Sequence, residues 1–366
     1  MEKDKKISGD SYGKIFVVTT WGTSHGPEMG AQIEGCPENL EISQEDIQKE
    51  VDRRKPKDPK ISTTRFEKDE VLIQSGLKNS KTDGKTITLV VKNENTRPQD
   101  YKNITNSFRP GHADISYFIK YGNSKNNTIA NQTGGGRASG RETVSRVMAG
   151  AIAKAILKKE NKTEIFGHTL QIGKIKAKDF DKDFIEENPL RTADKLAFLK
   201  MMKIVQDARK NGDSVGGIIE IIIKNPPKGL GEPVFDKLDA ELSKALMSIG
   251  AVKGIEFGSG FASTRLSGSQ NNDQIEMKNK EIHFLSNNAG GILGGISTGD
   301  DIIIRLAIKP VASIAKLQKT ITKDLKNTEI QVLGRHDCCL APRIIPVAEA
   351  MCAIVLTDML LRKEKE

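Results

Sequence analysis

Residues that can bind anions and move protons are gathered in short glycine-rich segments of this 366-residue chain. One segment, 22–26, places Ser24 beside His25 directly after an apolar run, and another, 109–114, holds His112 between glycine and alanine, close to an arginine and an aspartate. A histidine near fixed charge is suited to acid or base catalysis around neutral pH. These segments therefore predict a polar site that uses His25 and His112.

The longest such segment, Gly134–Leu157, passes from a glycine-rich turn into a predicted helix. Its helical part has apolar residues at three- and four-residue spacing, which is typical of one buried face. Ser139 and Glu142 fit a capping box at the helix start. The first N–H groups of a helix carry partial positive charge, and Arg137 and Arg141 add fixed charge suited to phosphate or carboxylate. The segment predicts an anion cradle, although a glycine turn before a capped helix is also ordinary architecture.

The pattern Gly22-x-Ser24-x-Gly26 also matches the nucleophile elbow of serine hydrolases. An elbow needs a helix directly after the serine, but Pro27 and further glycines follow here. Adjacent Ser24 and His25 are poorly placed to act as nucleophile and base, yet both can contact one anion. A serine hydrolase that uses Ser24 is the first alternative.

The chain is basic, with a formal net charge of +9 from 57 Lys and Arg against 48 Asp and Glu. Such a balance fits nucleic acid, an anionic small molecule or a general excess of lysine. Many arginines lie beside Gly, His or Ser, which favours a compact anionic ligand. Only 5% of the residues are aromatic, so platforms for stacking bases are not evident. A basic nucleic-acid-binding protein is the second alternative.

Length and cysteine usage narrow the class of protein further. A chain of 366 residues with 37% apolar content can bury a large core, as one domain or as two entwined halves. Cys36, Cys338, Cys339 and Cys352 form no CxxC pair and no metal-ligand spacing, which indicates structural thiols in a reduced, cytoplasmic setting. The cysteine spacing therefore predicts no metal site. No stretch approaches the roughly 18 apolar residues of a membrane span, so we expect no membrane partner.

Local patterns predict a mixture of helices and strands. Strands are expected over 14–20, 216–224, 252–257 and 302–308, helices over 44–54, 235–249 and 346–361, and a hairpin over 71–91 that turns at Asp83 and Gly84. Residues 158–209 are interpreted as a charged surface excursion with helical periodicity near 193–208. The segment from Gly334 into the last helix has the same shape as Gly134–Leu157, which hints at an internal duplication.

Three blocks of the sequence resemble the three signatures of the chorismate synthase family. They are GTSHGPEMG at 22–30, GGGRASGRETVSRVMAGA at 134–151 and GRHDCCLAPRIIPVAEAM at 334–351. Four further segments resemble the family in the expected order, namely RPGHAD at 109–114, DSVGG at 213–217, LDAELSKALMSIGAVKG at 238–254 and NNAGGILGGIS at 287–297. The resemblance covers nearly the whole chain.

This resemblance implies a lyase of the shikimate pathway, in aromatic amino acid biosynthesis. The reaction would be a trans-1,4-elimination of phosphate from 5-enolpyruvylshikimate 3-phosphate to give chorismate. The family requires reduced FMN without net redox change, and NADPH is one possible reductant. The resemblance also implies an α+β fold, a single large domain over residues 1–366 built as a β-α-β sandwich of two intertwined structural repeats, and a homotetramer.

The resemblance carries roles to matching positions of this chain. His25 would protonate or stabilise the departing phosphate, His112 would supply a proton beside the reduced flavin, and Asp337 would accept a proton near flavin N5. The phosphate and carboxylates of the substrate would be bound by Ser24, Arg54, Lys60, Arg109, Ser139, Arg141 and Arg335. Flavin contacts are implied for Arg137, Ala138, Ser139, Gly250, Ala251, Gly294, Lys309, Pro310, Val311, Ala312, Ser313 and Arg335.

Three positions depart from the usual family pattern. Thr23 stands where the family usually has Glu, Lys60 where it usually has Arg, and Gly250 where Asn is common. Lys60 keeps a positive charge but loses the planar fork of arginine, and Gly250 offers only backbone groups. Because both histidines and the aspartate are present, we expect an active enzyme.

Overall fold

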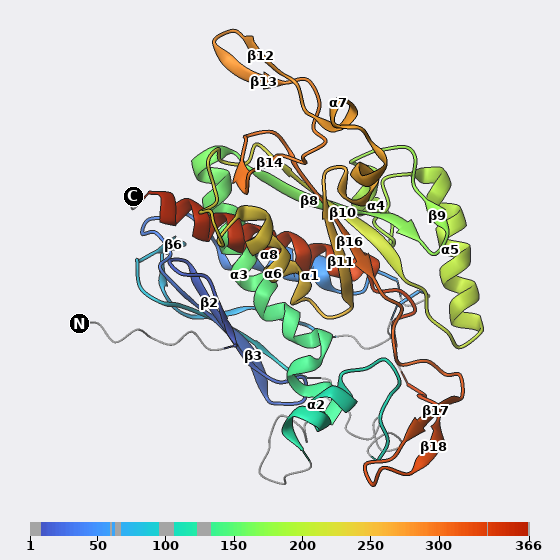
Figure 1. The fold of residues 1–366 in the computed structure, drawn as a ribbon. Coiled ribbons are helices and arrows are strands. Elements are labelled where there is room, and N and C mark those ends of the chain that lie inside the picture. The colour runs from blue at the N-terminus through green and yellow to red at the C-terminus, as the bar shows by residue number, and fades with distance from the viewer. Residues whose placement is uncertain are drawn as a thin grey trace.

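Two five-stranded antiparallel sheets contain the long strands of this computed structural model, which describes residues 9–58, 61–62, 67–94, 106–122, 133–334 and 336–364 (Figure 1). The first sheet has the order β1 (Ser11–Tyr12), β2 (Val17–Gly22), β3 (Glu28–Glu34), β7 (Ile87–Lys92) and β4 (Leu72–Ser75). The second has the order β11 (Val252–Phe257), β16 (Ile302–Ile308), β10 (Gly217–Lys224), β8 (Glu164–Ile172) and β9 (Ile175–Lys176). The mixed helix and sheet class agrees with the sequence-based prediction.

Two long helices connect the sheets. Helix α3 (Thr143–Asn161) packs on β2, β3 and β7, helix α8 (Ala341–Lys363) packs on β8 and β10, and the two helices pack against each other (Figure 1). A Cβ atom at Gly150 would lie 2.3 Å from the Cβ atom of Ala350, so glycine is needed where α3 and α8 approach. Helix α1 (Gln44–Arg54) contacts α3 and α8, and α6 (Leu238–Met247) contacts α8 and β11.

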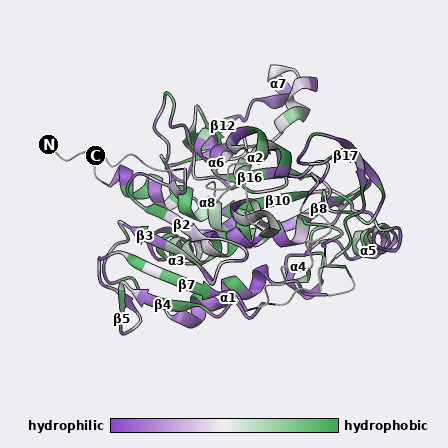
Figure 2. Cartoon of the chain, turned by 90° about the horizontal axis from the view of Figure 1, so that it is seen from below, coloured by the Kyte–Doolittle hydropathy of each residue, from purple (hydrophilic) through white to green (hydrophobic). Residues whose placement is uncertain are grey.

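Both sheets and these helices contribute to one buried apolar cluster. In β10 the side chains of Ile219, Ile221 and Ile223 are fully buried, whereas the residues between them are half-buried. This alternation places one face of the strand toward the core. Figure 2 shows hydrophobic residues gathered on the strands and helices of this centre, and hydrophilic ones along the outer loops.

Helix α8 is a longer apolar segment than the sequence analysis expected anywhere in the chain. By length and composition it is the one helix among the described residues that could cross a membrane, yet 94% of its most apolar window is buried inside the protein. A helix that is hydrophobic all round is also what the centre of a large core requires. The composition of α8 therefore reflects its contacts with α3, α6 and the second sheet.

The two halves of the chain follow the same order of elements when short insertions are left aside. The first half runs β2, β3, α1, β4, β7, α3, and its strands lie in the order β2-β3-β7-β4. The second half runs β8, β10, α6, β11, β16, α8, and its strands lie in the order β8-β10-β16-β11. In each half the fourth strand lies between the second and the third.

The remaining helices, 3-10 turns and hairpins lie around the two sheets and the core helices. The other helices and the 3-10 turns are α2 (Asp114–Tyr121), η2 (Thr133–Ala138), η3 (Gly140–Glu142), α4 (Phe184–Glu187), α5 (Lys195–Lys210), η4 (Gly260–Arg265) and α7 (Gly268–Asn271). The hairpins are β5 (Leu77–Lys78) with β6 (Lys81–Thr82), β12 (Ile275–Lys278) with β13 (Glu281–Phe284), β14 (Ile292–Leu293) with β15 (Ile296–Ser297), and β17 (Gln318–Ile321) with β18 (Asn327–Ile330).

Several predicted elements are confirmed and three predictions are wrong. Helix α1 and strands β11 and β16 have the predicted bounds. Within the predicted hairpin β4 pairs with β7, but the β5–β6 hairpin lies between them, so the chain does not turn at Asp83 and Gly84 alone. Residues 158–209 are not only a surface excursion, because they contain β8, an inner strand of the second sheet. The sequence of β8 shows little apolar alternation, because small or polar residues such as Gly167 and Thr169 occupy buried positions.

The other two wrong predictions concern helix starts. Ser139 does not form a capping box with Glu142. Its side chain instead accepts a hydrogen bond from the Arg141 N–H at the start of η3, and α3 begins one turn later. Helix α8 begins at residue 341, so Pro346 lies inside the helix and not in its first turn.

A buried carboxylate joins α1, α3, α8 and β8. The Glu349 carboxylate, which is 0% exposed, lies 2.6 Å from Arg53 Nη1 and 2.7 Å from Lys154 Nζ, and it accepts a hydrogen bond of 2.9 Å from the Gly167 N–H. Burial alone would raise the pKa of Glu349, but Arg53 and Lys154 lower it to about 2. The position of the last turn of α1 therefore depends on this ion cluster.

We expect Glu349→Gln to lower the free energy of unfolding by about 3 kcal/mol, because Arg53 and Lys154 then lose the charge they share. Urea denaturation measures this change. Glu41→Gln is the matched control, since Glu41 pairs with Lys81 at 3.1 Å on the surface and its side chain is 79% exposed. Its effect should stay below about 1 kcal/mol. Equal effects of the two substitutions would contradict the role of the buried cluster.

The stability should also depend on pH through Glu349. Its pKa is lowered from 4.5 to about 2 by folding, so its contribution is present above pH 4.5 and is lost as the pH falls toward 2. Urea denaturation at several acidic pH values should therefore show a steeper loss of stability in the unsubstituted protein than in Glu349→Gln. Parallel pH profiles would show that this carboxylate does not titrate with unfolding.

Candidate active site

The predicted site residues gather where four helices begin or end. Arg54 is the last residue of α1, Arg141 lies in η3 just before α3, Gly250 follows α6, and Asp337 precedes α8. The turn after β2, the residue directly after β7 and the run after β16 belong to the same region. The site is therefore built from segments that are far apart in the sequence and joined by the contacts described below.

A buried carboxylate that sequence analysis did not identify lies at the centre of the arginines. Asp69 Oδ2 lies 2.8 Å from Arg54 Nη2, and Asp69 Oδ1 pairs with Arg141 Nη1. These three residues are at most 7% exposed. Burial alone would raise the pKa of Asp69, but the two guanidinium groups lower it. Asp69 therefore remains charged and holds both arginines in place.

Positive charge nevertheless exceeds negative charge around Arg54. Burial lowers its pKa to about 10, Asp69 opposes that shift, and the nearby Arg141 and Arg343 add to it. The Nε atom of Arg54 is buried without a hydrogen-bond partner among the described residues. Buried polar groups are normally hydrogen-bonded, so this group of guanidinium ions is suited to an anionic ligand.

Asp337 is held by an arginine that sequence analysis also missed as a site residue. Its Oδ2 atom lies 2.6 Å from Arg343 Nη1, and its side chain is 11% exposed. Arg343 lies within the third family-like block, so the sequence contained it, but only its distance from Asp337 assigns it to this carboxylate. The pair adds a second, half-buried Arg–Asp contact beside Arg54.

Ser24 and His25 lie in the turn that joins β2 to β3. The Ser24 hydroxyl oxygen is 3.0 Å from His25 Nδ1, and Ser24 is fully buried. The segment after the turn is strand β3 and not a helix, so the strand–turn–helix geometry of a nucleophile elbow is not formed. The serine hydrolase alternative is therefore wrong, and the hydrogen bond serves to orient the imidazole ring.

His112 belongs to a second cluster of charged groups. Its Nδ1 atom lies 2.7 Å from Asp114 Oδ1, and Asp114 also binds Arg109 through Nε at 2.7 Å. Burial alone would raise the pKa of Asp114, but hydrogen bonds from Arg109 and His112 lower it strongly. Arg109 Nη2 also lies 3.1 Å from His112 Nδ1, so both the carboxylate and the guanidinium hold this side of the imidazole ring.

Further contacts join this cluster to the predicted flavin-binding residues. Arg109 Nη1 donates to the Ser313 hydroxyl over 3.3 Å, and the Lys309 ammonium donates to the Gly111 carbonyl. The Lys309 N–H donates to the Ala251 carbonyl over 2.9 Å. The run from Lys309 to Ser313, with Pro310, Val311 and Ala312, is thereby placed beside Arg109.

The remaining contacts link the same run to the start of α8. The Ser214 hydroxyl donates to the Val311 carbonyl over 2.8 Å, and the Val215 N–H donates to the Cys338 carbonyl over 2.9 Å. Because Cys338 follows Asp337, the DSVGG segment at 213–217 holds Asp337 near Val311. This segment therefore has a structural role at the site.

Arg137 fixes the glycine-rich turn against the end of β2. Its Nη2 atom lies 2.7 Å from Asp10 Oδ1 and 2.8 Å from the Thr20 hydroxyl, and its Nη1 donates to the Gly22 carbonyl over 3.3 Å. Arg137, Ala138 and Ser139 are thus held next to the turn that carries His25. At the start of α3, Arg146 donates to the Ser248 hydroxyl over 2.5 Å, which brings the end of α6 to the same place.

Not every predicted residue joins this region. Gly294 is exposed in the β14–β15 hairpin, and the adjacent Gly295 carbonyl accepts a hydrogen bond of 2.8 Å from the Leu238 N–H at the start of α6. Gly250 follows the opposite end of α6, so Gly294 and Gly250 lie apart within a single chain. Lys60 and Arg335 lie outside the described residues.

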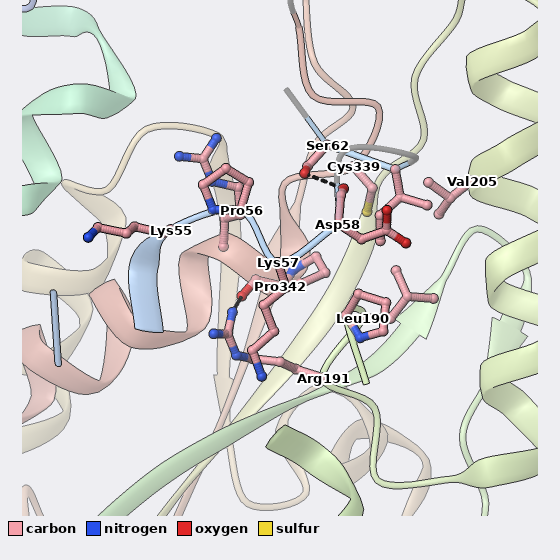
Figure 3. A pocket seen from close by; sticks show the side chains of 13 residues that line it. Lys55, Pro56, Lys57, Asp58, Ser62, Leu190, Arg191, Val205, Cys339 and Pro342 are labelled. Atoms are coloured by element: carbon pink, nitrogen blue, oxygen red, sulfur yellow. Dashed lines mark hydrogen bonds between the residues drawn. The ribbon is translucent and has the colours of Figure 1, made fainter. Parts of the chain in front are cut away.

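A narrow pocket borders the site between the segment after α1 and the start of α8 (Figure 3). Arg191 lines it and donates to the Pro342 carbonyl over 2.7 Å and to the Arg53 carbonyl, which ties the two helices together. Cys339 also lines the pocket, and burial raises the pKa of its thiol to about 12. This thiol is therefore structural at neutral pH.

Comparisons with known proteins agree with the resemblance noted in the sequence. The family model for chorismate synthase matches residues 16–361. A chorismate synthase of Methanosarcina acetivorans is 50% identical over 361 residues, covering 97% of each chain, and one of Desulfatibacillum aliphaticivorans is 48% identical over 357 residues, covering 98% of this chain and 97% of the relative. A crystal structure of chorismate synthase superposes with a TM-score of 0.75 at 30% identity, covering 96% of this chain and 93% of the other.

We expect Asp69→Asn to destabilise the protein by about 3 kcal/mol, because it leaves two buried guanidinium groups without their counter-ion. Inorganic phosphate should partly restore the melting temperature by binding those groups. Differential scanning fluorimetry with and without phosphate measures both effects. The control Asp52→Asn removes an exposed partner of Lys55 and should change neither value. If Asp69→Asn is as stable as the unsubstituted protein and insensitive to phosphate, Asp69 does not hold these arginines.

Proposed function

The chain belongs to the chorismate synthase family, and we propose that the charged region around Asp69 and Asp114 is its catalytic centre. The enzyme is a lyase that eliminates phosphate from 5-enolpyruvylshikimate 3-phosphate and forms chorismate. The observation that carries the proposed site is the convergence of buried Arg54 and Arg141 on one aspartate beside the turn of His25. An excess of guanidinium charge suits a substrate with one phosphate and two carboxylates.

Ser24, His25, Arg54, Ser139 and Arg141 are proposed to bind the anionic groups of the substrate. Lys60 and Arg335 are proposed for the same task by family resemblance alone. His25 is oriented by the Ser24 hydroxyl at 3.0 Å, which supports its proposed role as the group that protonates the departing phosphate. Arg109 also binds Asp114 and is proposed to contact a carboxylate of the substrate.

His112 is proposed to hold a transferable proton beside the cofactor. Asp114 holds its Nδ1 atom at 2.7 Å and thereby orients the ring for this role. Asp337 is proposed to accept the proton that leaves the substrate. Its contact with Arg343 at 2.6 Å orients the carboxylate for this role.

The donor groups near Lys309 fit reduced FMN. A Cβ atom at Gly250 would meet nothing within 4 Å, so the backbone there borders open space. The Lys309 N–H donates to the Ala251 carbonyl next to it, and Lys309 and Ser313 are proposed to supply cationic and hydroxyl groups for a flavin phosphate, with Arg137 added by resemblance. When bound, reduced FMN supplies an electron to the substrate and takes it back, so the reaction has no net redox change. We propose that Arg137, Ala138, Ser139, Gly250, Ala251 and residues 309–313 hold it. Gly294 is proposed only by resemblance, and NADPH remains one possible reductant.

The larger architecture is also a proposal in part. The shared element order of the two halves supports a single domain over residues 1–366 built as a β-α-β sandwich of intertwined repeats. A cytoplasmic homotetramer is proposed as well. The β12–β13 hairpin supports association, because Ile275, Met277 and Ile282 on it are 63%, 71% and 63% exposed.

The decisive experiment is the anaerobic conversion of 5-enolpyruvylshikimate 3-phosphate with chemically reduced FMN. We expect chorismate and phosphate in equal amounts, with no net consumption of the reduced flavin. Folded protein that forms no chorismate would contradict the function. Repeating the assay with oxidised FMN and NADPH as the only reductant decides whether this enzyme reduces its own flavin.

We expect His25→Ala and His112→Ala each to lower kcat by about 10²-fold or more, the usual scale for a positioned acid or base. The same anaerobic assay measures these rates. His283→Ala is the control, because this side chain is 55% exposed on β13 and should leave kcat unchanged. Rates near that of the unsubstituted enzyme in both site variants would remove the proposed roles.

A further inference from the structure

We propose that Asn93 is a positioning residue, whose carboxamide fixes the turn of His25 relative to Arg141. The inference rests on the proposed function in so far as it takes His25 and Arg141 as parts of the catalytic site. Asn93 directly follows β7, which is an inner strand of the first sheet. It therefore connects a rigid element with two groups that must meet one substrate.

The carboxamide of Asn93 contacts both sides of the site at once. Its Nδ2 atom donates to the Thr23 carbonyl over 3.0 Å and to the Gly26 carbonyl over 2.8 Å, so both N–H groups point into the turn of His25. Its Oδ1 atom accepts a hydrogen bond of 2.9 Å from Arg141 Nε. The backbone N–H of Asn93 adds a bond of 2.9 Å to the Pro27 carbonyl.

The turn needs this support because it lies beyond the last pair of the β2–β3 ladder, Gly22 and Met29. Within the turn, the Gly26 N–H donates to the Thr23 carbonyl and hydroxyl oxygens, each over 3.1 Å. The contacts of Asn93 hold the same two residues from the side of the sheet. Ser24 and His25 lie between Thr23 and Gly26, so the carboxamide fixes the backbone from which the His25 imidazole ring extends.

Only a group with donors at one end and an acceptor at the other satisfies these contacts. A reversed carboxamide would direct its oxygen at the Thr23 and Gly26 carbonyls and its N–H groups at Arg141, and every contact would be lost. A carboxylate of the same shape keeps the acceptor for Arg141 but places a second acceptor against two carbonyls. The substitution Asn93→Asp therefore removes the contacts with the turn and keeps the contact with Arg141.

Arg141 is itself fixed on its far side. Its Nη1 atom pairs with buried Asp69, and its Nε atom binds Asn93. The path from Asp69 through Arg141 and Asn93 to the turn contains direct contacts only. A displacement of about 1 Å in such a site can cost about 10²-fold in rate, which sets the scale of the expected effect.

The test is a double-mutant cycle between Asn93 and His25 in the chorismate assay. We expect Asn93→Asp to lower kcat by about 10²-fold with less than about a 3-fold change in KM, because it keeps the acceptor for Arg141. Asn93→Ala also releases Arg141, so it should lower kcat at least as much and raise KM as well. In the His25→Ala background Asn93→Asp should cost less than about 3-fold, since the group that it positions is already missing. The control Asn161→Asp replaces an exposed carboxamide that donates to the Asn225 carbonyl over 2.8 Å, and it should have no effect.

Two outcomes of the cycle overturn the proposal. Full activity of Asn93→Asp would show that the donors to the turn do not matter. Additive losses in the double variant would show that Asn93 acts on structure at large and not through His25. If Asn93→Ala fails to fold, Asn93→Asp carries the cycle, because it has the shape of the original side chain.

Hydrogen exchange supplies a readout that needs no substrate. Amide exchange measured by mass spectrometry should be at least about 10-fold faster in peptides spanning residues 22–30 of Asn93→Asp, and unchanged in Asn161→Asp. Unchanged exchange in both variants overturns the proposal. Failure of the unsubstituted protein to form chorismate would overturn the proposed function, whereas this measurement would still decide whether Asn93 holds the turn.

Discussion

Buried carboxylates shared between cations are the interactions on which this structure depends. Glu349 binds Arg53 and Lys154 in the middle of the protein, and Asp69 binds Arg54 and Arg141 at the site. A buried charge is tolerated only when it is paired and hydrogen-bonded. These two carboxylates therefore fix the orientation of the last turn of α1.

Consecutive arginines at the end of α1 have separate tasks as a result. Successive residues of a helix point about 100° apart, so Arg53 reaches Glu349 in α8 while Arg54 reaches Asp69. The first contact connects the helices of the core, and the second belongs to the group of buried guanidinium ions at the proposed site. Neighbouring residues thus serve the core and the proposed site, and both rely on the same helix end.

The sequence predicted the elements with strong patterns and the residues within contiguous motifs. Helix α1 and strands β11 and β16 have clear periodicity, and their bounds are confirmed. Strand β8 was missed because its buried positions include Gly167 and Thr169, which give no apolar alternation. Ser139 was assigned to the wrong cap because sequence spacing cannot distinguish a 3-10 turn from the first turn of an α-helix.

By itself, the sequence determined the family and indicated the types of group proposed for the chemistry, because glycines, histidines and arginines in short ordered blocks carry that information locally. Only the tertiary structure decided which groups act together. Asp69, Asn93 and Arg343 lie outside the residues singled out for chemistry, and their partners are up to 72 positions away in the chain. Their importance comes from hydrogen bonds and ion pairs across that separation, which spacing along the chain does not encode.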